Sequence, residues 1–207
     1  MNLNRLKLGN SKLPNYVAVF DLPAGPPKEG GTCLNCATCW ETCYARKAQR
    51  MYPQTRRWRD TNRDLMEQAL PELFHLIFEQ IQYDPKIQIV RIHSSGDFMS
   101  NQYIDYWAWL VKTMKELRPE VQFYTYTKVL HKFRAAFNRL ADAGCNIVDS
   151  CNGDPDSKNF GNEQWCYAFM RNHITFTCPA TFKNAETKCM ENCRHCLTSD
   201  RVIFLEH

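Results

Sequence analysis

The sequence predicts an α/β fold in which parallel strands form a partial, barrel-like (β/α) sheet with cysteine-rich loops at the carboxyl ends of the strands. Short apolar runs alternate with longer segments of helical periodicity, which is the pattern of parallel strands joined by helical crossovers. About six strands and three or four helices are expected, a number that suits an open or partial barrel better than a closed one.

The expected elements follow from apolar periodicity and from the residues that interrupt it. Strands are expected at residues 16–22, 86–93, 121–128, 146–149, 173–177 and 202–205. Helices are expected at residues 43–50, 61–82, 101–117 and 131–143. Prolines and a glycine within residues 23–27 end the first strand, and Gly144 ends the last of these helices.

Composition favours one domain without a membrane segment. The chain has 207 residues, 44% of them hydrophobic, and it contains no internal repeat or long flexible linker, so we expect a single domain over residues 1–207. No apolar run reaches the roughly 18 residues of a membrane span, and residues 1–10 are polar and basic rather than a secretory signal. The expected location is the cytoplasm, with no membrane partner.

The chain contains eleven cysteines, which a reducing compartment would not keep as structural disulfides. The first group has the spacing C-x2-C-x2-C-x3-C and comprises Cys33, Cys36, Cys39 and Cys43. The second group comprises Cys178, followed by Cys189, Cys193 and Cys196 as C-x3-C-x2-C. Dense thiolate sets select zinc or iron–sulfur centres, and the close spacing favours one or two [4Fe-4S] clusters, with zinc as the alternative.

Both groups are expected at one end of the sheet. The first follows the first strand, and Cys178 follows the strand that ends at Thr177. Because the carboxyl ends of parallel strands gather at one end of the sheet, the two groups are expected to lie together there and could share ligands. The remaining cysteines, Cys145, Cys151 and Cys166, are expected to be small buried apolar residues.

Polar residues at the ends of two further strands are candidates for holding a cofactor. Ser95, Gly96 and Asp97 follow one strand, where the glycine allows close approach of a ligand and the polar side chains can hydrogen-bond it; the alternative is a turn that caps the next helix. His93 ends the same strand and is either structural or functional. Lys128 ends the next strand and either binds a carboxylate or phosphate or is solvated.

A basic stretch, Arg46 to Arg63, gives an alternative function. It holds seven of the chain's 26 basic residues together with Tyr52 and Trp58, which is the pattern of arginines on phosphates with an aromatic residue on a base. A solvated face, or arginines that cover an anionic cluster, would show the same pattern.

Short motifs spread over nearly the whole chain carry a family resemblance. They are Leu22-Pro23-Ala24-Gly25, Thr32-Cys33, Cys39-x3-Cys43-Tyr44-Ala45, Arg91-Ile92-His93-x-Ser95-Gly96-Asp97-Phe98, Tyr124-x-Tyr126-Thr127-Lys128 and Cys178-Pro179-Ala180. This set resembles the phage and prophage family called gene product 88. The resemblance implies a viral or mobile-element origin, and hence the cytoplasm of a host cell.

The layout is also similar to that of radical S-adenosylmethionine enzymes, with a cysteine loop after the first strand and a Gly-containing acidic motif after the second. This resemblance implies that Cys33, Cys39 and Cys43 bind a [4Fe-4S] cluster, and that Ser95, Gly96 and Asp97 hold the amino group of S-adenosylmethionine. The sequence departs from the family in that Cys36 would supply a fourth ligand, and the C-x3-C-x2-C order of those enzymes occurs only in the second group.

The leading hypothesis is an iron–sulfur protein of the gene product 88 type, with a redox or radical-enzyme role and a small molecule or redox protein as its partner. The alternative is a zinc-stabilised nucleic-acid-binding module that uses Arg46 to Arg63. A third hypothesis is a purely structural scaffold, in which the metal has no role beyond joining the two ends of the chain.

Overall fold

A computed structural model describes residues 5–10, 12–36, 39, 43–150, 164–168, 175–177, 189–191, 193–198 and 201–204. Its strands are β1 (Lys7–Leu8), β2 (Val17–Phe20), β3 (Ile89–Ile92), β4 (Gln122–Thr127), β5 (Cys145–Ser150), β6 (Gln164–Ala168), β7 (Thr175–Thr177) and β8 (Arg201–Phe204). Its α-helices are α1 (Tyr44–Met51), α2 (Pro53–Gln68), α3 (Leu70–Tyr83), α4 (Asn101–Leu117) and α5 (Arg134–Asp142).

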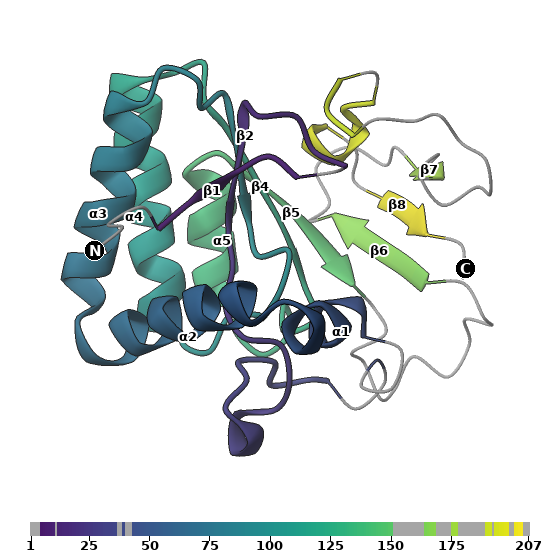
Figure 1. Cartoon of the computed structure of the whole chain (residues 1–207). Helices are drawn as coiled ribbons and strands as arrows, with labels where there is room; N and C mark the ends of the chain where they lie inside the picture. The colour runs from purple at the N-terminus through teal and green to yellow at the C-terminus, as the bar shows by residue number, and fades with distance from the viewer. Residues whose placement is uncertain are drawn as a thin grey trace.

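The strands form one open, mostly parallel sheet (Figure 1), in the order β1-β2-β3-β4-β5-β6-β8-β7. Strands β2 to β5 are parallel neighbours in chain order, and the register aligns Val19 with Arg91, Arg91 with Tyr124, and Tyr124 with Asn146. Strands β1 and β6 pair antiparallel with the two sides of this parallel centre. The α/β fold with a parallel sheet at its centre is therefore confirmed.

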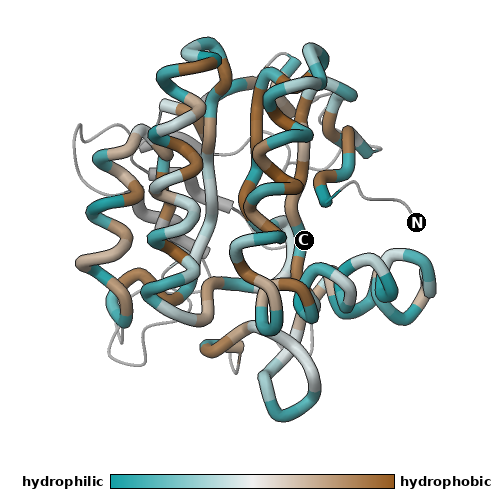
Figure 2. The backbone as a smooth tube through the Cα atoms, turned by 90° about the vertical axis from the view of Figure 1, so that its left-hand side faces the viewer, coloured by the Kyte–Doolittle hydropathy of each residue, from teal (hydrophilic) through white to brown (hydrophobic). Residues whose placement is uncertain are grey.

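Helices α3, α4 and α5 cover one face of the sheet (Figure 1). Seen from that side, each of them shows both hydrophilic and hydrophobic residues along its length (Figure 2). Helix α4 begins where the Ser100 hydroxyl accepts a hydrogen bond from the Tyr103 backbone N–H at 3.2 Å, and it buries Tyr103, Trp107 and Met114 in the main core. A polar cap followed by an apolar stripe explains why this helix has the predicted bounds.

The single helix expected over residues 61–82 is two helices in the structure. Helix α2 ends at Gln68, Ala69 leaves the helical conformation (φ −148°, ψ 56°), and α3 begins with Pro71 in its first turn. Proline lacks the backbone N–H that a continuing helix needs, but it is well accommodated in a first turn. Pro53 begins α2 in the same way, eight residues before the predicted start.

Strands β1 and β6 were not expected from the sequence. Each pairs at a border of the parallel centre: Leu8 lies opposite Ala18, and Tyr167 lies opposite Asp149. β1 has only two residues and β6 lies between β5 and β8, and such strands are held by backbone pairing more than by an apolar pattern, so periodicity alone did not predict them. No helix among the described residues is long and apolar enough to cross a membrane.

A second apolar cluster lies on the sheet face opposite the helices. Val17, Ile89 and Tyr124 project from that face and are packed against Met190, which is 2% exposed. The segment that carries Met190, drawn in yellow in Figure 1, therefore brings the cysteines near the end of the chain onto this inner face.

Candidate metal centre

The loop after β2 folds back on itself and begins the first cysteine group. The Thr32 N–H donates to the Pro23 carbonyl at 2.9 Å, and the Cys33 N–H donates to the Gly25 carbonyl at 2.8 Å. The close approach requires glycine, because a Cβ on Gly31 would lie 2.1 Å from the Gly25 carbonyl oxygen. This turn holds Cys33 beside the carboxyl end of the sheet.

Cys43 is the thiol most suited to ligation. It is the residue that precedes α1, and its pKa is lowered to about 5, mainly because the Cys39 thiol donates a hydrogen bond to it. The backbone N–H groups of Arg46 and Ala45 and the Lys128 ammonium add smaller contributions. The pKa of Cys39 is raised instead, because Cys39 is the donor of this hydrogen bond and is partly buried. A thiolate is the form of cysteine that binds metal.

The other two cysteines of this group lie near enough to sense Cys43. The pKa of Cys33 is raised to about 12, mainly by burial, with smaller contributions from the charges of Asp97, Cys43 and Cys36. Burial also raises the pKa of Cys36, with a smaller contribution from Cys43. All four thiols of the first group are free and half-buried.

Two residues of the expected cofactor set act on these thiols through their charge: Asp97 raises the pKa of Cys33, and Lys128 acts on the other three. Its ammonium favours the thiolate form of Cys36, Cys39 and Cys43 and so lowers the pKa of each. Lys128 directly follows β4, which ends at Thr127.

Ser95 and Asp97 are buried, and Gly96 is half-buried, at the junction of three strand ends. The Asp97 carboxylate accepts hydrogen bonds from the Phe98 and Lys128 N–H groups and from the Thr127 hydroxyl, at 2.8, 2.9 and 2.8 Å. Burial raises the pKa of Asp97 to about 6. Both carboxylate oxygens thus join β3 to β4, and the expected role in holding a cofactor stays a prediction.

His93 lies on the helix side of the sheet, away from the cysteines. Its ring packs 4.5 Å from that of Phe98, and its Nε2 lies 2.8 Å from the Tyr103 hydroxyl. Burial lowers the pKa of His93 to about 3, so the ring is neutral at pH 7. The structure therefore gives His93 a place in the core, and contact with a cofactor stays a prediction.

Asp21 organises the carboxyl ends of β2 and β3, and the sequence analysis missed it. Its carboxylate accepts hydrogen bonds from the backbone N–H groups of Ser94 and Ser95 at 2.7 and 2.9 Å, and it is paired with Arg59. The available signal was a lone acidic residue in the apolar run from Val17 to Leu22. A buried carboxylate in such a run requires a partner.

Arg59 connects this carboxylate to the helix that carries Cys43. Its Nη1 donates to the Ala45 carbonyl at 3.1 Å and to the Gln49 side-chain oxygen at 3.2 Å. The same Gln49 oxygen accepts the Ala24 N–H at 2.6 Å. Through these hydrogen bonds helix α1 is held against the loop after β2, and Cys43, the residue before α1, lies at the carboxyl end of the sheet.

The second cysteine group packs on the inner face of the sheet. Cys189 and Cys193 are joined by a backbone bridge, and the Met190 N–H donates to the Cys193 carbonyl at 2.7 Å. The Tyr126 hydroxyl donates to the Cys196 sulfur at 2.6 Å, and Asn146 Nδ2 donates to the Cys196 carbonyl at 2.6 Å. These contacts come from the interior of β4 and from the second residue of β5.

The second group extends along the inner face from Tyr16, before β2, to Tyr126, near the carboxyl end of β4, and the expected sharing of ligands between the groups stays a prediction. The first group lies at the carboxyl ends, whereas the Tyr16 hydroxyl, just before β2, holds the Met190 carbonyl of the second group at 2.6 Å. Figure 1 shows the yellow segment and α1 at opposite ends of the strands. The described residues around Met190 and Cys196 lie over the inner face, a position that strand order does not specify.

Cys178, the other expected ligand of the second group, lies outside the described residues. Among the residues that the structure describes, no three His, Cys, Asp or Glu side chains are already arranged to hold one metal ion. Cys145 is buried, as predicted for an apolar cysteine.

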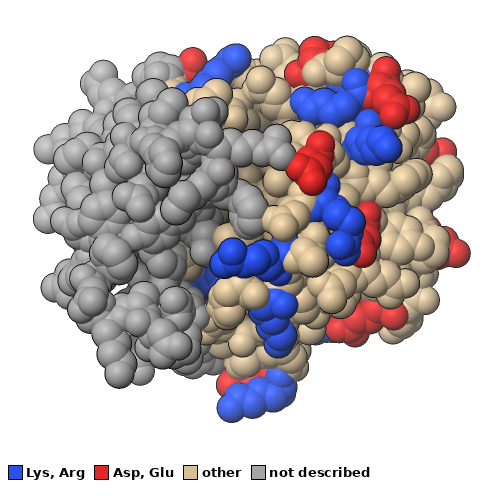
Figure 3. Space-filling model, turned by 180° about the vertical axis from the view of Figure 1, so that it is seen from behind, with Lys and Arg blue, Asp and Glu red and all other residues tan. Residues whose placement is uncertain are grey.

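Contacts within the chain occupy part of the basic stretch. Arg59 is paired with Asp21, Arg63 donates to the Gly30 carbonyl at 2.6 Å, and Arg56 lies 3.7 Å from Asp60. Basic and acidic side chains are interspersed over the described part of the face in Figure 3. Structural contacts therefore account for Arg56, Arg59 and Arg63, and these three residues give no support to nucleic-acid binding.

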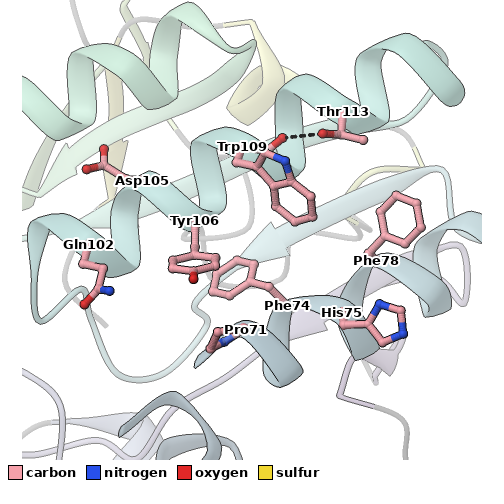
Figure 4. A pocket seen from close by; sticks show the side chains of 9 residues that line it. All are labelled: Pro71, Phe74, His75, Phe78, Gln102, Asp105, Tyr106, Trp109 and Thr113. Carbon is pink, nitrogen blue, oxygen red and sulfur yellow. Dashed lines mark hydrogen bonds between the residues drawn. The ribbon is translucent and has the colours of Figure 1, made fainter. Parts of the chain in front are cut away.

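A groove of about 850 Å³ lies between α3 and α4 (Figure 4). It is lined by Pro71, Phe74, His75, Phe78, Gln102, Asp105, Tyr106, Trp109 and Thr113. Phe74 and Tyr106 pack with their ring centroids 5.1 Å apart, and Trp109 is 50% exposed. The groove belongs to the helix layer and is separate from both cysteine groups.

Fold and site together define an α/β protein with a cysteine-lined loop at the carboxyl end of a parallel sheet. The chain belongs to the gene product 88 family, whose family model matches residues 2–144. The match includes the first cysteine group and ends before the second. Neither the comparison with curated proteins nor that with solved structures found a match.

Proposed function

We propose that the chain binds an iron–sulfur cluster through Cys33, Cys36, Cys39 and Cys43. The observation that carries the proposal is the hydrogen-bonded pair of thiols Cys39 and Cys43 beside the Lys128 ammonium. The pair supplies one ready thiolate and a second thiol in contact with it. Iron–sulfur clusters are held by such thiolates.

The donor set fits this group in chemistry and in charge. The four thiols are free, half-buried and confined to one loop, and the spacing follows the run found in bacterial ferredoxins. A cluster with four thiolates is an anion, and Lys128 offsets that charge from the end of β4. When bound, the cluster would supply one-electron transfer or an iron that accepts a ligand.

Metal and sulfide analysis of anaerobically purified protein tests the proposal. The unmodified chain is expected to contain iron and acid-labile sulfide. The Cys33→Ser/Cys39→Ser/Cys43→Ser variant is expected to lose the iron and sulfide that this loop binds. Cys145→Ala is the matched control, because Cys145 is buried and belongs to neither group. A colourless protein that contains zinc without sulfide would contradict the cluster and leave a zinc site.

The radical-enzyme role is the finer part of the proposal. If Cys36 is a fourth ligand, it occupies the coordination position on iron that S-adenosylmethionine would need. The Asp97 oxygens already accept hydrogen bonds from Thr127 and Lys128. The Ser95 hydroxyl is the available polar group, because it is buried without a hydrogen-bond partner among the described residues. Adding S-adenosylmethionine should change the EPR spectrum of the reduced protein if this role holds. An unchanged spectrum rejects the role and leaves the cluster.

A further inference from the structure

We infer that Cys189, Cys193 and Cys196 form a second, separate metal–thiolate centre, with Arg91 as its counter-charge and Tyr126 as a hydrogen-bond donor to one of its sulfurs. This inference is independent of the first cysteine group, which lies at the carboxyl ends of the strands.

The backbone places two of the three cysteines side by side. The bridge between Cys189 and Cys193 makes a tight turn, in which Met190 has a positive φ of 70°. A turn that holds several cysteines close to one another is typical of thiolate metal sites.

The Tyr126 hydroxyl completes the surroundings of one sulfur. Its 2.6 Å hydrogen bond to the Cys196 sulfur comes from a different element, the central strand β4. Metal ligands are commonly oriented by such outer partners, which fix the position of the ligating atom. Strand β4 thus helps to position the Cys196 sulfur, the atom that would bind the metal.

Arg91 places a positive charge beside this group. Its guanidinium lies 6.0 and 5.5 Å from the ring centroids of Tyr124 and Tyr126, on the inner face of the sheet. Its Nε is buried without a hydrogen-bond partner in the described part of the chain. No carboxylate among those residues lies within ion-pair distance of it, and Asp21, which acts on Arg91 from farther away, is itself paired with Arg59.

A guanidinium in such a place needs an anion, because a charge removed from water is costly without a partner. Three neutral thiols would not supply one, whereas metal-bound thiolates carry negative charge. Tyr126, whose ring lies 5.5 Å from the Arg91 guanidinium, is also the residue that hydrogen-bonds the Cys196 sulfur. The arrangement therefore favours a soft metal centre, either zinc or iron with sulfide, since both bind thiolates.

The first test separates the two centres by substitution in the full chain, purified without oxygen. The Cys33→Ser/Cys39→Ser/Cys43→Ser variant should still hold the second centre, detected as zinc or as iron with sulfide. The Cys189→Ser/Cys193→Ser/Cys196→Ser variant should lose that metal and keep the first centre. Either metal in the first variant supports the inference, and the absence of any bound metal from that variant overturns it. Failure of the first loop to bind iron would reject the proposed function alone.

The second test addresses the two supporting side chains and does not depend on the fold surviving three substitutions. Arg91→Gln and Tyr126→Phe should each weaken metal binding at the second centre by about 10- to 100-fold in a chelator competition, in the background lacking the first group. Arg91→Lys should restore part of the affinity, because it keeps the charge. Arg139→Gln, which removes an exposed arginine paired with Asp105, is the control. Unchanged affinity in Arg91→Gln overturns the counter-charge role.

Discussion

Arg59 and Asp21 form a buried ion pair in which Nη2 lies 3.0 Å from Oδ2, and the two side chains are 6% and 8% exposed. The pair joins three parts of the chain: α2, the end of β2, and the turn after β3 that Asp21 binds through the Ser94 and Ser95 N–H groups. Since Arg59 also holds Ala45 in α1, the position of Cys43 depends on this contact.

Replacing Arg59 with Met should lower the free energy of unfolding by about 3–5 kcal/mol, because the substitution leaves the Asp21 carboxylate buried without its partner. Urea unfolding at pH 7 measures the change. Arg56→Met is the matched control from the same helix: its pair with Asp60 is exposed, and its loss should cost no more than about 1 kcal/mol. Equal effects of the two substitutions would show that the Arg59 pair contributes no more than a surface contact.

Gly96→Ala should destabilise the protein more than Gly144→Ala. Both glycines have a positive φ, 78° and 107°, so both substitutions introduce backbone strain of about 1–3 kcal/mol. A Cβ at Gly96 would also lie 2.5 Å from the Thr32 hydroxyl and 2.6 Å from the Leu22 Cβ, whereas one at Gly144 would meet the flexible end of Lys115 at 3.2 Å. Thermal unfolding of the two variants compares them, and a larger loss for Gly144→Ala would contradict the packing at Gly96.

The parallel centre could be predicted because its strands and helices differ in period. Strands β3 and β4 fall inside the expected ranges, and α4 has the predicted bounds, since its buried residues recur at helical spacing after a Ser100 cap. The break at Ala69 was missed because apolar residues continue in register on both sides of it. Pro71, which decides the break, acts through a missing N–H rather than through hydropathy.

The site could be predicted less well. Spacing identified the loop around Cys43, and strand order placed Lys128 beside it, because both lie at carboxyl ends of the same sheet. The location of Cys196 could not be derived, since it depends on a chain that turns back over the inner face to meet Tyr126. Arg91 was read only as part of a motif, because nothing in a sequence shows that an arginine within a strand faces inward without an acidic partner.

His93 and Asp97 should make opposite contributions to the pH dependence of stability. The pKa of His93 falls from 6.5 to about 3 on folding, so between those pH values the unfolded chain binds a proton that the folded chain does not. Stability therefore decreases as the pH falls through this window. The pKa of Asp97 rises from 3.8 to about 6, so between pH 6 and 3.8 the folded chain binds the extra proton and stability increases as the pH falls.

His93→Phe should remove the destabilising effect of acid that His93 contributes, which changes the slope of the unfolding free energy against pH by up to about 1.4 kcal/mol per pH unit between pH 6 and 4 and leaves the Asp97 effect unopposed. Urea unfolding across this range gives the slope, and the lost hydrogen bond to Tyr103 only adds an offset that does not vary with pH. His75→Gln is the control, because His75 is exposed beside Glu79. Parallel curves for His93→Phe and the unmodified chain would contradict the low pKa of His93.

Cys43 should react at a lower pH than the other cysteines of its loop in reduced, metal-free protein. Iodoacetamide attacks the thiolate, and the pKa of Cys43 is lowered to about 5 chiefly by the hydrogen bond from Cys39. Mass spectrometry of chain pulse-alkylated between pH 4 and 9 should give half-maximal labelling of Cys43 near pH 5.

Cys39→Ala removes the donor, so the labelling profile of Cys43 should move to higher pH, whereas Lys128→Met should move it less because the ammonium is a smaller influence. Cys36→Ala, which leaves the Cys39 donor in place, is the control. If Cys39→Ala leaves the profile where it was, the low pKa has another origin. The thiol pair would then no longer explain why a ligand-ready thiolate lies at the start of α1.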